Sequence, residues 1–224
     1  MTDTVRLSDV AMAAYCPRKL YYARTGDRSP PPEYDRALEL SRSYPALLGA
    51  SDAALSTMGL AVEPAEYRRR LARARDRLDS WTDLVDPAAV DVSVTGKDVH
   101  GRIPKVLDDP PTPVLVSPGE PPENGVWEPQ SVRAVGAAKA LAWRERTPVE
   151  WAVVEYPLSG VVRRVDLTTR KRAAFRRAVR AARAIDAPPP RLHDGAKCEA
   201  CGVAERCGVR TRSLRSLLSV SGGE

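Results

Sequence analysis

The sequence has no long apolar run, and this absence excludes two classes of protein. No stretch of the 224 residues approaches the roughly 18 apolar residues that a membrane-spanning helix needs. The opening segment, MTDTVRLSDVAMAAYCPRK, also lacks the central apolar region of a secretory signal peptide. We therefore expect a soluble, cytoplasmic protein that has no membrane partner.

Lysine is also scarce, although the chain is basic. Only six of the 35 basic residues are lysines, and the formal net charge is +6. Residues 163–183 concentrate the excess, because nine basic residues there accompany a single acid, Asp166. Guanidinium groups suit phosphate, so this concentration favours a nucleic-acid partner, whereas a high arginine content alone also follows from a GC-rich genome.

Cysteine is limited to four residues, and in a cytoplasmic protein these favour a metal or cluster over a disulfide framework. Within DGAKCEACGVAERCGVR the spacing C-x2-C-x5-C brings together Cys198, Cys201 and Cys207. Three thiolates leave a tetrahedral centre one ligand short. For the fourth ligand we favour Cys16, in AYCPRKLYY, over His193. Zinc and a 4Fe-4S cluster both accept four thiolates, so the spacing leaves the metal open.

The hydrophobic pattern predicts helices on both sides of an α/β core. We expect a first helix that Ser8 caps, weakly helical structure over 34–60 with an interruption at Pro45, and a firm amphipathic helix over 63–81. Five strands are expected, at 90–94, 99–106, 112–117, 149–157 and 160–168. A helix at 130–145 follows the third strand, and a basic helix at 169–185 follows the last.

This order predicts an α/β fold with a mixed sheet, organised as a single domain over 1–224. Its parts are an N-terminal helical region (1–88), an α/β core (89–185) and a C-terminal cysteine tail (186–224).

In motif order, YCPRKLYY near the start, the α/β region and the C-terminal C-x2-C-x5-C resemble the CRISPR-associated RecB-like exonucleases, the fourth Cas protein family. The resemblance implies a PD-(D/E)XK nuclease fold and a 4Fe-4S cluster held by Cys16, Cys198, Cys201 and Cys207. It also implies DNA as the substrate, CRISPR integrase proteins as partners, and a role in spacer acquisition during antiviral defence.

The catalytic groups of that family are missing at the matching positions. The metal-binding Asp falls at Pro104 in GRIPKV, and the Glu-x-Lys pair falls at Leu115 and Ser117 in PVLVSPG. The Gln and Tyr of the family's Gln-x-x-x-Tyr helix fall at Arg133 and Ala137. No Lys anywhere in the chain has an acid two residues before it. The resemblance therefore implies a catalytically degenerate member.

A displaced but working nuclease site is the alternative. It would need carboxylates to hold Mg²⁺ or Mn²⁺. The candidates are Asp108, Asp109, Glu120 and Glu155.

The basic helix carries the predicted DNA-binding residues. Four arginines follow one another on one face: Arg172, Arg176, Arg180 and Arg183. The apolar face holds Ala174, Ala178, Ala181 and Ile185, flanked by Phe175, Val179 and Ala182. We expect the arginine face to contact DNA phosphate, and the alternative is a solvated face. Four further arginines extend this basic surface in the tail: Arg206, Arg210, Arg212 and Arg215.

Three hypotheses for the function follow. The first, which we favour, is an iron–sulfur protein of the CRISPR adaptation type that binds DNA without cutting it. The second is an active metal-dependent single-strand DNA exonuclease with rearranged ligands. The third is a structural adaptor stapled by zinc, with no role on nucleic acid.

Overall fold

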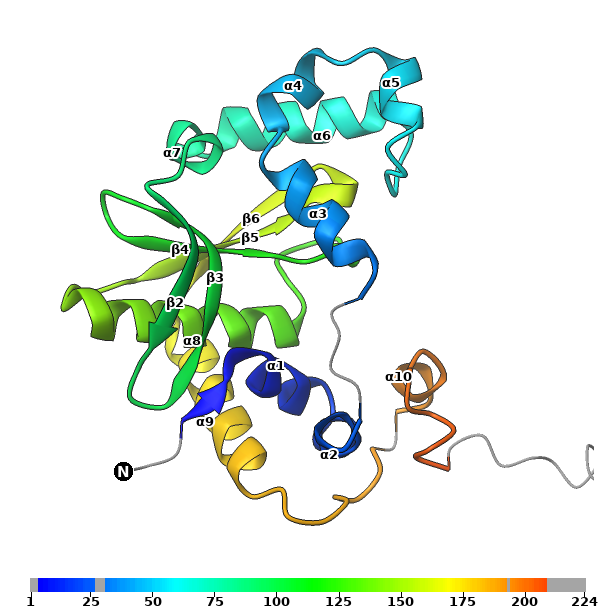
Figure 1. Cartoon of the computed structure of the whole chain (residues 1–224), viewed down its shortest axis with the longest axis vertical. Helices are drawn as coiled ribbons and strands as arrows, with labels where there is room; N and C mark the ends of the chain where they lie inside the picture. The colour runs from blue at the N-terminus through cyan, green and yellow to red at the C-terminus, as the bar shows by residue number, and fades with distance from the viewer. Residues whose placement is uncertain (1–3, 27–30, 193, 209–224) are drawn as a thin grey trace, which may run out of the picture.

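A six-stranded mixed sheet forms the centre of the computed structural model, which describes residues 4–26, 31–192 and 194–208 (Figure 1). Along the sheet the strands run in the order β1 (Val5–Arg6), β3 (Val99–Leu107), β4 (Thr112–Val116), β5 (Trp151–Tyr156) and β6 (Val161–Asp166). β2 (Ala89–Thr95) forms an antiparallel hairpin with β3. The β1–β3 and β4–β5 pairs are parallel, and the β3–β4 and β5–β6 pairs are antiparallel. The predicted α/β class with a mixed sheet is confirmed.

Helices cover both faces of this sheet and form a separate apolar cluster on each (Figure 1). One face carries α1 (Leu7–Tyr15), α8 (Glu128–Glu145) and α9 (Thr169–Arg183), with α2 (Pro17–Arg24) beyond them. The opposite face carries α3 (Glu33–Ser41), α4 (Tyr44–Gly49), α5 (Asp52–Ser56), α6 (Pro64–Arg77) and α7 (Trp81–Val85). The short helix η1 (Pro157–Ser159) follows β5. The short helix α10 (Gly195–Glu199) begins the cysteine segment.

Small residues let α8 lie close to the sheet and to its neighbouring helices. A side chain at Gly96, in the β2–β3 turn, would come within 2.8 Å of the Ala140 Cα atom on α8. A side chain at Gly136 would come within 2.8 Å of Leu7 and 3.0 Å of Phe175. Gly136 therefore allows α1 and α9 to pack against the same surface of α8.

Three N-terminal boundaries differ from the sequence-based expectations. The first helix begins at Leu7 and uses Arg6 as its N-cap, so Ser8 lies inside its first turn. Pro45 does not interrupt a helix but occupies the first turn of α4, where its missing N–H group costs no hydrogen bond. The helix expected over 63–81 ends at Arg77, and Trp81 opens the separate helix α7.

β3 bends at Pro104 and changes the core to which it contributes. Ile103 belongs to the cluster beneath α8, whereas Leu107 belongs to the cluster beneath α3–α7. The hairpin register has regular pairs on either side, at Val92↔Ile103 and Val90↔Lys105, and the intervening Asp91 has a φ of 54°. Because proline cannot donate to the strand ladder, the bend falls where the ladder is already interrupted.

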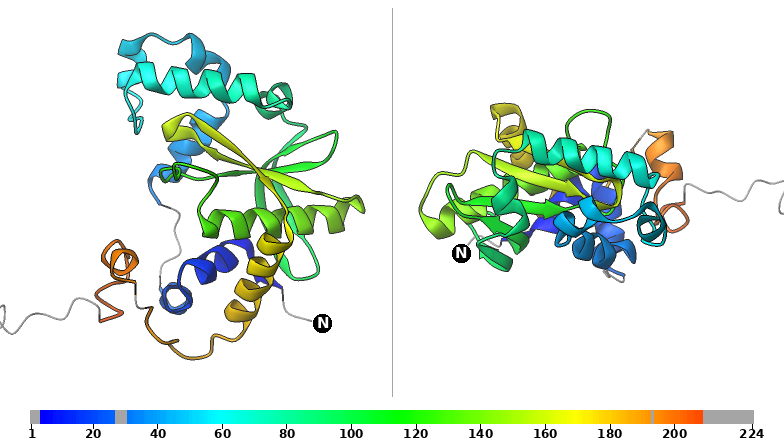
Figure 2. Two further views of the ribbon diagram at one scale, coloured as in Figure 1. Left: turned by 180° about the vertical axis from the view of Figure 1, so that it is seen from behind. Right: turned by 90° about the horizontal axis from the view of Figure 1, so that it is seen from above.

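Helix α2, near the start of the chain, lies beside the cysteine segment that follows α10. The view from behind in Figure 2 shows α10 near α2, and hydrogen bonds join Arg18 and Tyr22 of α2 to Cys207 and Arg206. Among the helices that the structure describes, none is long and apolar enough to cross a membrane.

Candidate functional site

One small pocket is lined by all four cysteines of the chain. Cys16 lies at the junction of α1 and α2, where its extended backbone separates the two helices. Cys198 lies in α10, and Cys201 and Cys207 follow in the turns after it. All four side chains are partly exposed and none forms a disulfide. The fold therefore brings the N-terminal cysteine to the three C-terminal ones, across most of the sequence.

The thiols line this cysteine pocket without closing on one point. In the part of the chain that the structure describes, no group of three or more His, Cys, Asp or Glu side chains is arranged to hold a metal ion. Desolvation raises the pKa of the Cys198 thiol, and the neighbouring Cys16, Cys207 and Cys201 thiols add to that effect. The four-ligand centre stays a prediction, and the alternative ligand His193 lies outside the described residues.

Side chains of YCPRKLYY hold the cysteine segment in place. Arg18 donates from Nε to the Cys207 Sγ atom at 3.2 Å and from a terminal nitrogen to the Pro189 carbonyl at 2.7 Å. The Tyr15 hydroxyl donates to the Lys197 carbonyl at 3.0 Å. From the other side, Arg206 donates to the Tyr22 carbonyl and stacks over its ring. These contacts join the segment around α2 to the cysteine segment through protein groups alone.

The residues of the cysteine pocket suit a thiolate-bound metal or cluster in kind. Four thiolates bring more negative charge than one metal ion or cluster neutralises. The pocket is lined by four cations besides its thiols: Arg18, Lys19, Arg191 and Lys197. An N–H group aimed at a sulfur atom, as Arg18 provides for Cys207, stabilises the thiolate form.

The positions matching the family's metal carboxylates are apolar and buried. Pro104 lies buried at the bend of β3, and Leu115 is only 2% exposed in the apolar cluster beneath α8. β3 and β4 pair antiparallel at Lys105↔Val114. If that register is continued by one residue, Pro104 falls opposite Leu115. The two positions are thus neighbours, and neither side chain has an oxygen to offer a metal.

The remaining matched positions surround the start of α8. Ser117 follows β4, is buried, and accepts a long hydrogen bond of 3.4 Å from Gln130. Arg133 is half-buried on α8, and its Nε atom is buried without a hydrogen-bond partner. Ala137, one turn further on, is fully buried.

The acids proposed for a displaced metal site are not brought together. Asp108, Asp109 and Glu120 are exposed in loops. Glu155 is fully buried in β5 and is bonded to Lys105. Among the described residues these four acids form no group able to hold a metal ion.

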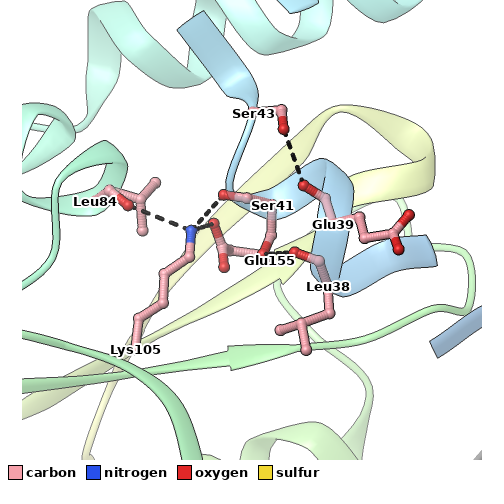
Figure 3. A network of polar contacts seen from close by, with 7 residues as sticks. All are labelled: Leu38, Glu39, Ser41, Ser43, Leu84, Lys105 and Glu155. Carbon is pink, nitrogen blue, oxygen red and sulfur yellow. Dashed lines mark hydrogen bonds and ion pairs between the residues drawn. The ribbon is translucent and has the colours of Figure 1, made fainter. Parts of the chain in front are cut away.

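The Lys105–Glu155 pair is a buried polar group that the sequence analysis missed. The Lys105 Nζ atom lies 3.0 Å from Glu155 Oε1, and it also donates to the Ser41 and Leu84 carbonyls (Figure 3). The Ser41 carbonyl lies at the end of α3 and the Leu84 carbonyl lies in α7. One ammonium group therefore joins two helices to the strands β3 and β5. The ring of Tyr44 lies 5.3 Å from the same nitrogen.

Burial controls the ionisation of this cluster. Desolvation raises the pKa of Glu155 from 4.5 to about 7, against the lowering effects of Lys105 and the Tyr44 hydroxyl. Burial first, and the Glu155 carboxylate second, also raise the pKa values of Tyr44 and Tyr67. The pair is enclosed by α3, α4, α6 and α7, so it supports the fold rather than facing a substrate.

The arginines predicted to bind DNA divide into two groups on α9. Arg176 and Arg180 are exposed, as is their neighbour Arg177. Arg172 instead donates to the Leu167 carbonyl at 2.8 Å, and Arg183 forms an ion pair with Asp98 at 3.3 Å. The buried face of α9 contains Phe175, Ala178, Val179 and Ala182, in agreement with the predicted apolar face. In the tail, Arg206 bonds to α2, while Arg210, Arg212 and Arg215 lie outside the described residues.

A second depression, which we call the Pro104 pocket, opens beside the bend of β3. Its walls come from the β1–α1 junction, α3, the β2–β3 hairpin and α8. Its charged and titratable lining consists of Arg6, Arg42, Asp91, His100, Arg102 and Arg133. Pro104 and Arg133, two of the positions matched to the nuclease motifs, therefore lie in one pocket that is rich in arginine.

Comparison with known proteins adds no relative. No protein-family model matches the chain, and no curated protein is significantly similar to it. The fold and the sites define an α/β protein whose six-strand mixed sheet packs against helices. Its function has to be argued from its own residues.

Proposed function

We propose that this chain is a RecB-like protein of the CRISPR adaptation type that binds DNA, holds a 4Fe-4S cluster and does not cut DNA. The observation that carries the proposal is the cysteine pocket, which Cys16 and the three cysteines of the tail line together. Cys16 and Cys198 are 182 residues apart, so the local chain does not bring them together. A shared metal centre would explain why they line the same pocket.

Cys16, Cys198, Cys201 and Cys207 are the residues that would hold the group. A cluster bound there would supply a structural cross-link between the chain ends, because closing a very long loop restricts the unfolded chain. Arg18 would hold the sulfur of Cys207 in its thiolate form and keep the tail against α2.

The lack of carboxylates at the matched positions of β3 and β4 supports the absence of DNA cleavage. A metal-dependent nuclease needs carboxylates that converge on the scissile phosphate. Pro104 and Leu115 supply none, and the buried carboxylate of the neighbouring strand β5, Glu155, is paired with Lys105. A scaffold without this chemistry retains its surface for binding DNA or CRISPR integrase proteins.

The DNA contact is supported by the exposed part of α9. Arg176, Arg177 and Arg180 face solvent, and in the described part of the chain none of them forms an ion pair. Unpaired guanidinium groups along one helix attract phosphate and release counterions when they bind it. Arg172 and Arg183 are excluded from this set, because both already have partners in the fold.

Anaerobic purification tests the metal centre. We expect a brown protein with broad visible absorbance and about four iron and four sulfide ions per chain. Cys16→Ser should lose the colour, whereas Ser56→Ala, on an exposed helix far from the pocket, should keep it. A colourless protein that contains one zinc ion would replace the cluster with the zinc-stapled alternative.

Incubation with labelled single-stranded DNA and Mn²⁺ tests the absence of cutting. We expect the DNA to bind and to remain intact. Cleavage that disappears in Asp108→Ala or Asp109→Ala would show that the second hypothesis, a rearranged nuclease, is correct.

A further inference from the structure

The Pro104 pocket has a large excess of positive charge. Four arginines and His100 line it, while the only acid among its lining residues is Asp91. Asp91 is already paired with Arg102 across the hairpin. Within the described residues, Arg6, Arg42 and Arg133 have no ion-pair partner. Three guanidinium groups thus converge on a concave surface without a counter-charge, and such a surface concentrates anions.

One of these arginines also has an unmet hydrogen-bonding need. The Nε atom of Arg133 is buried, and no described residue accepts a hydrogen bond from it. A buried donor without a partner destabilises the fold, so a ligand oxygen that accepts this bond would recover the lost stability. The Thr4 hydroxyl hydrogen-bonds to the Nδ1 atom of His100 at 2.9 Å. The Nε2 atom of His100 is therefore the ring nitrogen that can bond to the same ligand.

The shape and the remaining lining of the pocket suit a nucleotide. The cavity has a volume of about 480 Å³, within the range of small-molecule sites. Tyr34 and Leu38 of α3 supply an apolar wall beside the arginines. A sugar and base fit against such a wall while their phosphate meets the guanidinium groups.

We propose that the Pro104 pocket binds the terminal phosphate monoester of a single-stranded nucleic acid without a divalent metal. An internal phosphodiester carries one negative charge, whereas a terminal monoester carries close to two at neutral pH. Three uncompensated arginines gathered in one depression match the end of a strand better than its backbone. The proposal rests on the proposed function in one respect, which is that the chain binds nucleic acid.

Fluorescence anisotropy with internally labelled 20-nucleotide strands tests the proposal. Three versions of one sequence are compared in the presence of EDTA: one with a 5′-phosphate, one with a 3′-phosphate and one with hydroxyl groups at both ends. We expect one phosphorylated version to bind about tenfold more tightly than the hydroxyl version, which corresponds to about 1.4 kcal/mol. Equal affinities for all three strands would overturn the proposal and leave DNA binding itself intact.

Two matched double variants locate the effect. Arg42→Gln/Arg133→Gln should remove the preference for the phosphorylated end. Arg73→Gln/Arg77→Gln removes the same charge from the exposed side of α6 and should keep the preference. Loss of the preference in both variants would show that net charge, and not the pocket, is responsible. Circular dichroism and thermal unfolding confirm that each variant is folded.

A small ligand separates failure of the pocket from failure of the proposed function. If no strand binds at all, the proposed DNA binding is wrong, and calorimetry with thymidine 5′-monophosphate then tests the pocket directly. Binding that Arg42→Gln/Arg133→Gln abolishes, with thymidine as a negative control, supports a phosphate site. Absence of binding, or equal binding by the variant, overturns it.

Discussion

At the scale of single residues, Lys105 decides how β3 meets α3 and α7. Its ammonium group is 1% exposed and bonds to the Glu155 carboxylate and to carbonyls at the end of α3 and in α7. Breaking a buried ion pair leaves one charge without a partner, whereas replacing both members by apolar groups removes the desolvation cost of both. The pair therefore fixes positions more than it adds to stability.

Lys105→Met is expected to lower the free energy of unfolding by about 3–5 kcal/mol at pH 8, because the buried Glu155 then loses its counter-charge. Lys105→Met/Glu155→Leu should recover most of this loss. Urea denaturation measures both. Arg164→Met, which breaks an exposed pair with Asp166, serves as the control and should cost at most about 1 kcal/mol. A double variant no more stable than Lys105→Met contradicts the interpretation.

Glu155 also predicts a pH dependence of stability. Its pKa is 4.5 in the unfolded chain and about 7 in the folded one, so the folded state holds this proton more tightly. The contribution of Glu155 to stability is therefore complete below pH 4.5 and is lost as the pH rises to about 7. We expect Glu155→Gln to remove this part of the pH dependence when unfolding is measured between pH 4.5 and 8. Parallel curves for the two proteins would show that the carboxyl does not titrate in this range.

The sequence alone could not reveal this pair. Lys105 stands in the apolar run IPKVL and Glu155 in VVEYP, and each reads as an isolated charge in a buried strand. Fifty residues separate them, and their distance depends on how β3, β4 and β5 align. A lone charge within a strand that is apolar on both faces was the available signal, since such a charge needs a buried partner.

At the scale of elements, α8 depends on one glycine. Gly136→Val should lower the free energy of unfolding by about 1–3 kcal/mol, because its side chain would overlap Leu7 of α1 and Phe175 of α9. Gly119→Val is the control, since a Cβ atom there has no neighbour within 4 Å. Thermal or urea unfolding measures both. Similar losses in the two variants would show that the contacts of Gly136 with Leu7 and Phe175 are not the cause.

The exposed arginines of α9 predict how DNA binding responds to salt. Arg176→Gln/Arg180→Gln should weaken binding of single-stranded DNA, whatever its terminal group. The slope of log affinity against log salt should fall by about 1.4, which corresponds to two lost phosphate contacts. Anisotropy titrations at several salt concentrations measure this slope. An unchanged slope would remove α9 from the DNA-binding surface.

Periodicity predicted the elements better than their ends. The five predicted strands and the helices at 130–145 and 169–185 are present, because alternation and three-to-four spacing reflect burial directly. The errors lie where chain geometry, and not burial, sets a boundary: Ser8 and Pro45 both fall inside first turns. β1 has two residues and was missed, since no period can be read from a strand that short.

At the scale of the whole molecule, contacts near the cysteine pocket connect the two ends of the described chain. If the proposed cluster is bound, Cys16→Ser should make the purified protein more susceptible to proteolysis between residues 186 and 192, because the hydrogen bonds of Tyr15, Arg18 and Arg206 would then hold the tail without it. Limited trypsin digestion followed by mass spectrometry measures the cleavage rate. Treatment of the unmodified protein with a chelator should give the same cleavage rate as Cys16→Ser. Different rates would show that Cys16 protects the tail by some means other than a bound metal.

The candidate sites were predictable to different degrees. Cysteine spacing identified residues that line one pocket, because the chemistry of thiols restricts where they occur. The arginine face of α9 was predicted as four equal members, but Asp98 and the Leu167 carbonyl engage two of them. The Pro104 pocket was not predicted, because its arginines come from four separate segments and show no period in the sequence.

The bend at Pro104 has a further consequence for how the molecule unfolds. β3 contributes Ile103 to one core and Leu107 to the other. Unfolding of either core would therefore displace a strand on which the other core depends. The helices on the two faces therefore cannot behave as independent modules, even though they share no apolar cluster. Calorimetry should record a single transition, and hydrogen exchange should release amides of α6 and α8 together.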